Sequence, residues 1–558
     1  MVEKFLSSRW AKFLFALSVV AFAVLQIRTG NIIVMISNIP IAFALAFFIE
    51  YKYKVLGKLF EIKSRKYMFI SLSIAVYTAI EIVLFFYNRW IVRFFGTTEN
   101  YFVLEIRNLL SEQFLRVGVY TLAIMTGIVA LFVIFAVVYA IVSRFKKIAT
   151  RVWQGTEKLE RVYFAATVLI LGVFIAVVYN LSPIFWGDNT LPWRGINFIF
   201  DLDVGYNLDL DAQFLSTPLV NIRRLFYPLV NFPFALIARV LGRIFFFIPL
   251  VYIYFLQLFH IALMACGGIL MARMCNISGG SKKYFLALYT ISYPFLVFSI
   301  PLERYILPTF CVILLMYICI YVPKAKFVAA LAAAGTLTTS IVVLPFVAYN
   351  RKIKTWFFNF FKLGGGLVAI CILCGMLPII YNPIQSVLGT LDSFAGGVST
   401  EQKALQFINF VGSVFIQPET AFRYRMCPID NIEFITYALA PPAFINWIAV
   451  LLILLSIVGF ILNRKLRFAQ MSFLWAIFAF FVLFVMGWQA RENEMFLSAL
   501  YFGWAFFVLV FMFFEKLLEK QRTIKYVVYS VMLVVMAIIN INGIIELVQF
   551  GIEHYPAR

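Results

Sequence analysis

The feature that most constrains this 558-residue chain is its series of long apolar runs, separated by short polar segments. A helix of about 20 apolar residues spans the hydrocarbon core of a bilayer. The composition agrees, because 63% of the residues are hydrophobic and only 13% are charged. We therefore expect an all-α polytopic membrane protein with about 13 transmembrane helices. The runs lie near residues 10–27, 31–49, 67–87, 118–143, 161–181, 245–271, 283–301, 305–322, 364–381, 441–463, 470–488, 495–514 and 526–548.

The lysines predict which side of the membrane each loop occupies, since cytoplasmic loops are enriched in basic residues. If the N-terminus is cytoplasmic, 21 of the 22 lysines are cytoplasmic and only Lys403 is not. This count requires residues 327–349 to form a re-entrant hairpin on the cytoplasmic side instead of a full crossing. The centre of that segment, around Gly335, is small and polar, which permits a turn that is enclosed by protein.

The predicted topology explains the net charge of +21. Most basic residues stand in short segments between apolar runs, where they orient the helices. We therefore expect a multi-pass protein of the inner or plasma membrane, with the lipid bilayer as its surroundings and no nucleic-acid partner.

Loop length divides the chain into two predicted parts. Residues 1–160 form an N-terminal membrane extension of four helices, and residues 161–558 form a core with large outer loops at 182–244 and 382–440. Within the first of these loops, residues 227–243 are predicted to form an interfacial helix. Arg239 and Arg243 are four residues apart, and would share one face of that otherwise apolar helix.

Aspartate is concentrated in one outer loop. Five of the seven aspartates lie between Phe185 and Arg243, namely Asp188, Asp201, Asp203, Asp209 and Asp211. Carboxylates beside a membrane are costly, so a cluster of them indicates a functional site. A loop that needed only solubility would mix in glutamate and lysine. Residues 209 and 211 share a face in a strand and diverge in a helix, and the sequence leaves both conformations open.

Arginine dominates the other predicted outer charges, with 15 of the 25 arginines on that side. A guanidinium group binds phosphate with two parallel hydrogen bonds, so this face suits a phosphorylated lipid. The alternative is that many of these arginines anchor helix ends to headgroups. The candidate substrate-binding residues are Arg223, Arg224, Glu303, Arg304, Arg423, Arg425, Arg491 and Glu494.

Structural roles compete for the same candidate residues. Glu303 and Arg304 could cap and anchor helices. Arg423 and Arg425 could pair with Glu419 or Asp430, which would close their loop. Arg491 and Glu494 are spaced as an ordinary ion pair on one helical turn.

Other chemistries are disfavoured by composition. The chain has two histidines, His260 in an apolar run and His554 near the C-terminus, so a Ser-His-Asp hydrolase is not expected. The aspartates could bind a hard cation through oxygen. Because arginines already supply positive charge, we favour acid–base chemistry with no metal and no required cofactor.

The acidic outer loop, the turn Leu302-Glu-Arg-Tyr305, the hairpin centre Ala333-Ala-Gly-Thr-Leu-Thr-Thr-Ser340 and the late outer Arg491 together resemble the GT-C superfamily of integral-membrane glycosyltransferases. The likeness is strongest to bacterial relatives of protein O-mannosyltransferases and lipid A aminoarabinose transferases, and it covers roughly residues 161–550. Two features depart from the family: four helices precede the core, and three aspartate positions compete where a close acidic pair is typical.

The resemblance implies an inverting sugar transfer on the outer face of the membrane. The donor would be a polyprenyl-phosphate-linked sugar, and the acceptor an envelope glycan, lipid or protein. The general base would be Asp209 or Asp211, with Asp188 next, and Arg304, Arg423, Arg425 and Arg491 would hold the lipid phosphate. The main alternative is a transporter or flippase for a lipid-linked or anionic solute, although the chain shows no repeated halves. A scaffold in an envelope-assembly complex is a third reading.

Overall fold

The structure is a computed structural model of the chain. It describes residues 155–187, 191, 198–200, 224–225, 227–245, 247, 250–277, 279–349, 351–373, 397–426, 431–437, 444–490 and 495–557. The chain folds into two compact units, and most described residues belong to the unit formed by residues 158–214, 222–363 and 383–558. The expected N-terminal extension lies almost entirely outside the described residues, so its boundary near residue 160 stays a prediction.

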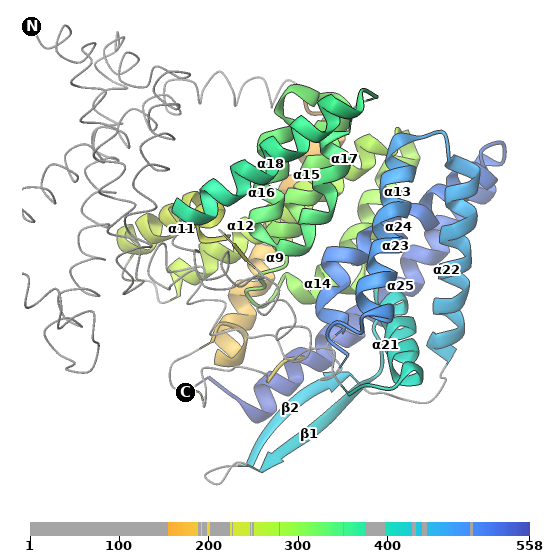
Figure 1. The fold of residues 1–558 in the computed structure, drawn as a ribbon. Coiled ribbons are helices and arrows are strands. Elements are labelled where there is room, and N and C mark those ends of the chain that lie inside the picture. Colours follow the sequence, from red (N-terminus) through yellow and green to blue (C-terminus); the bar gives the residue numbers. More distant parts are fainter. Residues whose placement is uncertain are drawn as a thin grey trace, which may run out of the picture. The chain divides into compact units, whose positions relative to one another are not determined.

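Helices dominate this unit (Figure 1). Within the described residues, five helical segments are long and apolar enough to cross a membrane. They are α9 (Lys158–Leu181), α12 (Val251–Met274), α23 (Arg467–Ala479) with its π-helical extension Phe480–Val485, α24 (Ala499–Leu517) with the preceding 3₁₀ turn Met495–Ser498, and α25 (Arg522–His554). The chain is therefore a helical membrane protein. The total of about 13 spans stays a prediction.

Further apolar helices belong to this unit: α13 (Gly279–Ile291), α14 (Tyr293–Phe298), α15 (Ile306–Tyr321) and α22 (Phe444–Asn463). Helix α18 (Ile353–Leu373) begins in it, and its residues from 364 onward belong to the other unit. The span predicted at 283–301 is divided between α13 and α14. The break falls at Ser292, which has extended backbone before Pro294. Proline lacks the backbone donor that would continue a helix, which explains the division.

Helix α24 lies at the centre of the packing and is buried along most of its length. Its contact with α22 depends on Gly459. A Cβ atom at that position would collide with the carbonyl oxygen of Leu509. A glycine therefore permits the two backbones to approach, as small residues commonly do in membrane proteins.

One end of the bundle carries buried ion pairs, and we call it the lysine end. Arg273 at the end of α12 donates to the carboxylate of Glu160 at the start of α9, with a shortest distance of 2.5 Å. Lys282 near the start of α13 lies 2.6 Å from the same carboxylate. Lys525 of α25 pairs with Glu515 of α24 at 3.1 Å. The first two contacts join the ends of α9, α12 and α13, and the third joins α24 to α25.

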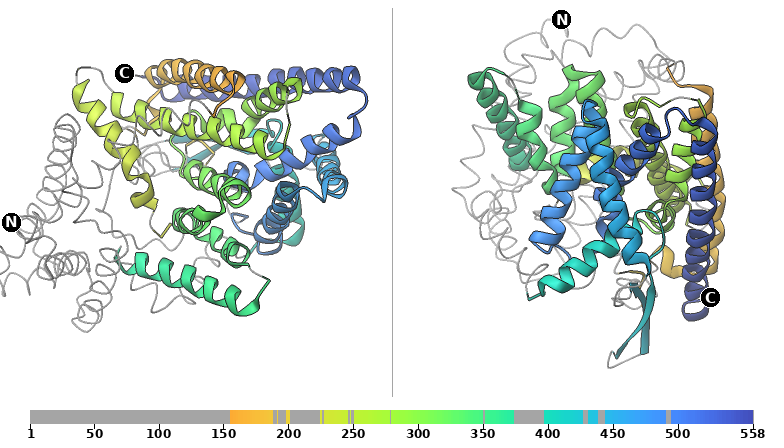
Figure 2. Two further views of the ribbon diagram at one scale, coloured as in Figure 1. Left: turned by 90° about the horizontal axis from the view of Figure 1, so that it is seen from above. Right: turned by 90° about the vertical axis from the view of Figure 1, so that its right-hand side faces the viewer.

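The opposite end carries a short β-hairpin, and we call it the hairpin end. Helices α9 and α25 run side by side and both finish there (Figure 2). The Ser182 hydroxyl donates to the carbonyl oxygen of Tyr555 at 2.6 Å, and the Tyr555 hydroxyl donates to the carbonyl oxygen of Glu433 at 2.6 Å. The end of the chain is thereby attached to both α9 and the hairpin.

The hairpin itself departs from the all-α expectation. Strand β1 (Thr420–Met426) pairs antiparallel with β2 (Asn431–Tyr437), with Ala421 opposite Thr436 and Arg425 opposite Ile432. In β1, Phe422 and Tyr424 alternate with arginines, and β2 contains isoleucine, phenylalanine, threonine and tyrosine. Such aromatic and β-branched residues favour strands.

Residues 326–349 fold back on themselves, as predicted for 327–349. Helix α16 (Lys326–Thr336), a 3₁₀ segment (Thr338–Val343) and α17 (Leu344–Ala348) follow one another. The Lys326 ammonium group donates to the carbonyl oxygen of Val347 at 2.6 Å, so the two ends of the segment meet. Its middle contacts α24, where the hydroxyls of Ser340 and Tyr501 lie 2.6 Å apart.

The helix predicted at 227–243 is present as α11 (Tyr227–Ile244). It packs closely against the start of α12. A Cβ atom on Gly242 would lie 2.9 Å from the Cβ atom of Tyr252. The helix is therefore attached to the bundle, and its place in the membrane interface stays a prediction.

Candidate functional site

The aspartate-rich segment leaves the bundle at the hairpin end. The backbone N–H of Phe200 donates to the carbonyl oxygen of Ile435 at 2.9 Å, and the N–H of Ile435 donates to the carbonyl oxygen of Phe198 at 3.0 Å. Residues 198–200 thus lie beside β2. The buried ring of Phe200 stacks on Tyr437 with centroids 4.1 Å apart. Asp201 follows Phe200 directly in the sequence, so the start of the segment is anchored.

Arg224 anchors the other end of the same segment. Its side chain is 5% exposed, and its guanidinium carbon lies 5.2 Å from the ring centroid of Tyr305 and 5.5 Å from that of Tyr227. A desolvated guanidinium over an aromatic face is stabilised by about 2 kcal/mol. This contact joins the aspartate-rich segment to the turn Pro301–Tyr305 between α14 and α15.

Tyr305 forms hydrogen bonds with Glu303 and Gln489, and Gln489 links it to Ser498. Its backbone N–H donates to the Glu303 carboxylate at 3.1 Å, and its hydroxyl accepts from the Gln489 amide at 3.2 Å. The Ser498 hydroxyl donates to the amide oxygen of Gln489 at 2.5 Å. Gln489 has a φ of 64°, a left-handed conformation that costs a non-glycine residue about 1–2 kcal/mol. These contacts hold a strained residue beside the Arg224 anchor.

Buried charge collects around Tyr305. Arg224, Glu303 and Arg304 are 5%, 3% and 7% exposed. Burial, followed by the charge of Arg304, lowers the pKa of Arg224 to about 10, whereas Tyr305 and Glu303 act in the opposite direction. Within the described residues, the Nη1 atom of Arg224 is buried and has no hydrogen-bond acceptor. Two arginines this close, in a place shielded from water, would stabilise a bound anion.

An aromatic cluster joins these parts. The ring of Phe496 lies 4.4 Å from that of Tyr437, 5.5 Å from those of Phe298 and Tyr293, and 6.2 Å from that of Phe200. Phe496 follows the predicted candidates Arg491 and Glu494 closely in the sequence. Residues of the predicted outer loops 182–244 and 382–440 therefore meet Phe496 at the hairpin end.

For Arg423 and Arg425, the structure gives the positions of the backbone in β1. They lie in β1 opposite Phe434 and Ile432 of β2. Positions two apart share one face of a strand, so the two arginines occupy equivalent places. Their proposed pairing with Glu419 or Asp430 stays a prediction.

The remaining candidates divide into two groups. Arg224, Glu303 and Arg304 lie together, and Glu303 also accepts from the N–H of Tyr305 at the start of α15, as the capping alternative expects. The others lie outside the described residues: Asp188, Asp209, Asp211, Arg223, Arg491 and Glu494.

Sequence reasoning did not identify Tyr305 and Gln489 as site residues. Tyr305 directly follows the candidate arginine, so an aromatic partner for a buried guanidinium was a usable signal. The left-handed backbone of Gln489 has no comparable sequence signature.

Histidine takes no part in the cluster around Tyr305. His260 is buried within α12, and the Nδ1 atom of His554 lies against the carboxylate of Glu433. Among the described residues, no group of three histidine, cysteine, aspartate or glutamate side chains comes together to hold a metal. The aspartate-rich segment lies outside that search, so metal-free chemistry stays a prediction.

Comparison of the chain with family models, with curated proteins and with solved structures found no match. The resemblance to GT-C glycosyltransferases therefore rests on the placement of motifs in the sequence. The function has to be inferred from the geometry at the hairpin end.

Proposed function

We propose that the chain is an integral-membrane glycosyltransferase that uses a polyprenyl-phosphate-linked sugar as donor. One observation carries the proposal: the aspartate-rich segment ends at a buried arginine that lies on Tyr305 beside Arg304. An acidic segment supplies a base, and adjacent buried guanidinium groups supply a site for phosphate. A transfer reaction in which a phosphate group leaves requires both a base and a phosphate site, and here the acidic segment runs directly into the arginine.

Arg224 and Arg304 are proposed to bind the donor phosphate. The Nη1 atom of Arg224 offers a buried donor, and the guanidinium group lies over the rings of Tyr227 and Tyr305. Charge builds on the phosphate as the sugar leaves, and preorganised donors in a shielded place stabilise that charge strongly. Arg423, Arg425 and Arg491 are proposed to complete this face from β1 and from the connection that precedes Phe496.

Asp209 or Asp211, with Asp188 as the next candidate, is proposed to act as the general base. The carboxylate accepts the proton of an acceptor hydroxyl, and the hydroxyl oxygen bonds to the anomeric carbon of the sugar. The bond between that carbon and the phosphate oxygen breaks, and its electron pair leaves with the lipid phosphate. A single displacement inverts the anomeric configuration. A positioned base contributes about 10²- to 10⁴-fold to the rate.

We propose that the hairpin end faces the outside of the cell membrane and the lysine end faces the cytoplasm. Lys282, Lys326 and Lys525 are described at the lysine end or in the folded-back segment that follows α15, which fits the enrichment of basic residues in cytoplasmic loops. In this orientation the fold-back at 326–349 enters from the cytoplasmic side. The N-terminus is then cytoplasmic, and about 13 spans cross the membrane.

Replacement of the candidate bases tests the proposal. Lipid that co-purifies with the protein is first identified by mass spectrometry, and its sugar transfer is then measured in vesicles. Asp209→Asn or Asp211→Asn is expected to lower transfer by about 10²- to 10⁴-fold without changing thermal unfolding.

The matched control is Glu519→Gln, an exposed carboxylate at the lysine end, which should keep full transfer. Full activity in asparagine variants of all five clustered aspartates would refute the mechanism. Lipid movement across the vesicle membrane without a glycosylated product would instead support the transporter alternative.

A further inference from the structure

An apolar groove at the lysine end is separate from the site at the hairpin end. It has a volume of about 830 Å³ and lies between α15, the folded-back segment 326–349 and α23. This volume falls in the range of ligand sites, about 300–1,000 Å³. The groove therefore has room for a small molecule or a lipid chain.

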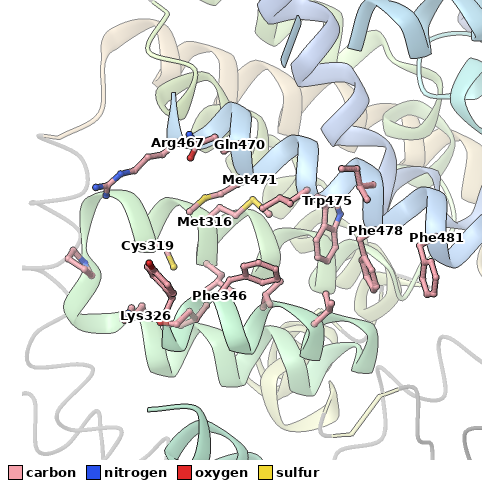
Figure 3. A pocket seen from close by; sticks show the side chains of 18 residues that line it. Met316, Cys319, Lys326, Phe346, Arg467, Gln470, Met471, Trp475, Phe478 and Phe481 are labelled. Carbon is pink, nitrogen blue, oxygen red and sulfur yellow. Dashed lines mark hydrogen bonds between the residues drawn. The ribbon is translucent and has the colours of Figure 1, made fainter. Parts of the chain in front are cut away.

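The lining of the groove is asymmetric along its length (Figure 3). Arg467, Gln470 and Lys326 lie toward one end, and Trp475, Phe478 and Phe481 lie toward the other. Polar groups at one end and aromatic rings at the other match an amphiphile with a polar head and an apolar tail.

The length of the groove matches one leaflet of a bilayer. Arg467 and Phe478 both line it, and the helical rise between them is about 17 Å. The hydrocarbon core of a bilayer is about 30 Å thick, so one leaflet supplies about half of that length. An acyl chain whose headgroup lies near Arg467 would thus reach the aromatic end.

The polar end carries positive charge. Arg467 is exposed, and Lys326 is half-buried with its ammonium group on the carbonyl oxygen of Val347. Within the described residues, neither cation forms an ion pair with a carboxylate. A phosphate group is the complementary partner for such a pair of cations. A zwitterionic headgroup would bring its own cation to the same place.

We propose that this groove binds one anionic phospholipid, with its phosphate at Arg467 and Lys326 and an acyl chain along α23. The lipid contacts the folded-back segment 326–349, whose middle is bonded to Tyr501 of α24. It therefore supports the packing of that segment. The binding is independent of the sugar donor, because the groove and the candidate active site share no residues.

Lipid binding to the purified full chain tests the proposal. The protein is titrated in detergent with phosphatidylglycerol or phosphatidylcholine, and bound lipid is counted by native mass spectrometry. The wild type should retain one phosphatidylglycerol in preference to phosphatidylcholine. Arg467→Glu should weaken phosphatidylglycerol binding about tenfold, because the charge at the phosphate is reversed.

A variant that fills the groove tests the contribution of the cavity to lipid binding separately from that of the charges. Ile477 lines the groove and is 48% exposed, so Ile477→Trp should block the acyl chain while the cations remain. The controls are Lys520→Glu, an exposed lysine of the same end, and Ile461→Trp on α22, which does not line the groove. Both controls should bind as the wild type does.

Three outcomes overturn the proposal. The first is equal retention of the two lipids by the wild type. The second is unchanged phosphatidylglycerol binding in Arg467→Glu or in Ile477→Trp. The third is a loss of thermal stability in Ile477→Trp with no change in bound lipid, which would indicate that protein fills the groove.

Discussion

The two ends of this bundle treat buried charge differently. At the lysine end, the Glu160 carboxylate accepts from Arg273 and pairs with Lys282, so opposite charges are in direct contact. At the hairpin end, the Arg224 guanidinium group lies over the ring of Tyr305, and the charge of Arg304 lowers the pKa of Arg224. The ions at the lysine end neutralise one another and hold helices together, whereas the Nη1 atom of Arg224 keeps hydrogen-bonding capacity for a ligand. The contrast separates a structural end from the proposed catalytic end.

The largest expected effect on stability comes from the lysine end. Glu160→Gln leaves Arg273 and Lys282 without their shared carboxylate, and it should lower the free energy of unfolding by about 3–5 kcal/mol. Thermal or denaturant unfolding in detergent measures this change. Glu519→Gln, at an exposed site of the same end, should have little effect.

A triple variant sharpens that prediction. Glu160→Met with Arg273→Met and Lys282→Leu removes all the ions together, so no charge is left buried and alone. Its stability should lie near that of the wild type, since apolar replacement of a whole buried ion cluster is often neutral. If Glu160→Gln is as stable as the wild type, the lysine end is not held by these ions.

The hairpin end should respond in activity before it responds in stability. Arg224→Lys keeps the charge and loses the planar fork and the stacking on Tyr305. We expect kcat/KM for sugar transfer to fall about tenfold, which corresponds to about 1.4 kcal/mol. Thermal unfolding should change little, because the lysine ammonium group can still lie over the aromatic rings. Arg464→Lys, an exposed arginine at the other end, is the matched control. Equal kcat/KM in wild type and Arg224→Lys would remove Arg224 from the site.

The smallest expected difference, about 1 kcal/mol, separates two variants of Gln489. Gln489→Ala removes the hydrogen bonds to Tyr305 and Ser498 and keeps a left-handed residue with a Cβ atom, which should cost about 1–3 kcal/mol. Gln489→Gly loses the same hydrogen bonds but relieves the backbone by about 1 kcal/mol. Unfolding experiments should therefore rank glycine above alanine. The reverse ranking would show that the left-handed backbone carries no strain.

Sequence patterns predicted the features that depend on local chemistry. Apolar length identified the helical membrane core, small residues around Gly335 identified the fold-back, and the spacing of Arg239 and Arg243 identified α11. Each signal lies within about 20 consecutive residues, the length of one span.

Long-range contacts were not predictable from these patterns. Glu160 and Arg273 are 113 residues apart in the chain, and Gln489 and Tyr305 are 184 residues apart. The segment predicted as the outer loop 382–440 contains the β-hairpin, because the alternating aromatic residues of β1 favour a strand where its arginines suggest a loop. Which aspartate acts as base depends on residues outside the described part of the chain.

The contacts of Tyr555 have a consequence for the order of assembly during synthesis. Its carbonyl oxygen holds Ser182 at the end of α9, and its hydroxyl holds the backbone of Glu433 in the hairpin. A ribosome adds residue 555 after residues 182 and 433, the two that it holds. The proposed outer site therefore closes only when α25 has been inserted, and a nascent chain that stalls before this point would expose an unfinished hairpin end to quality control.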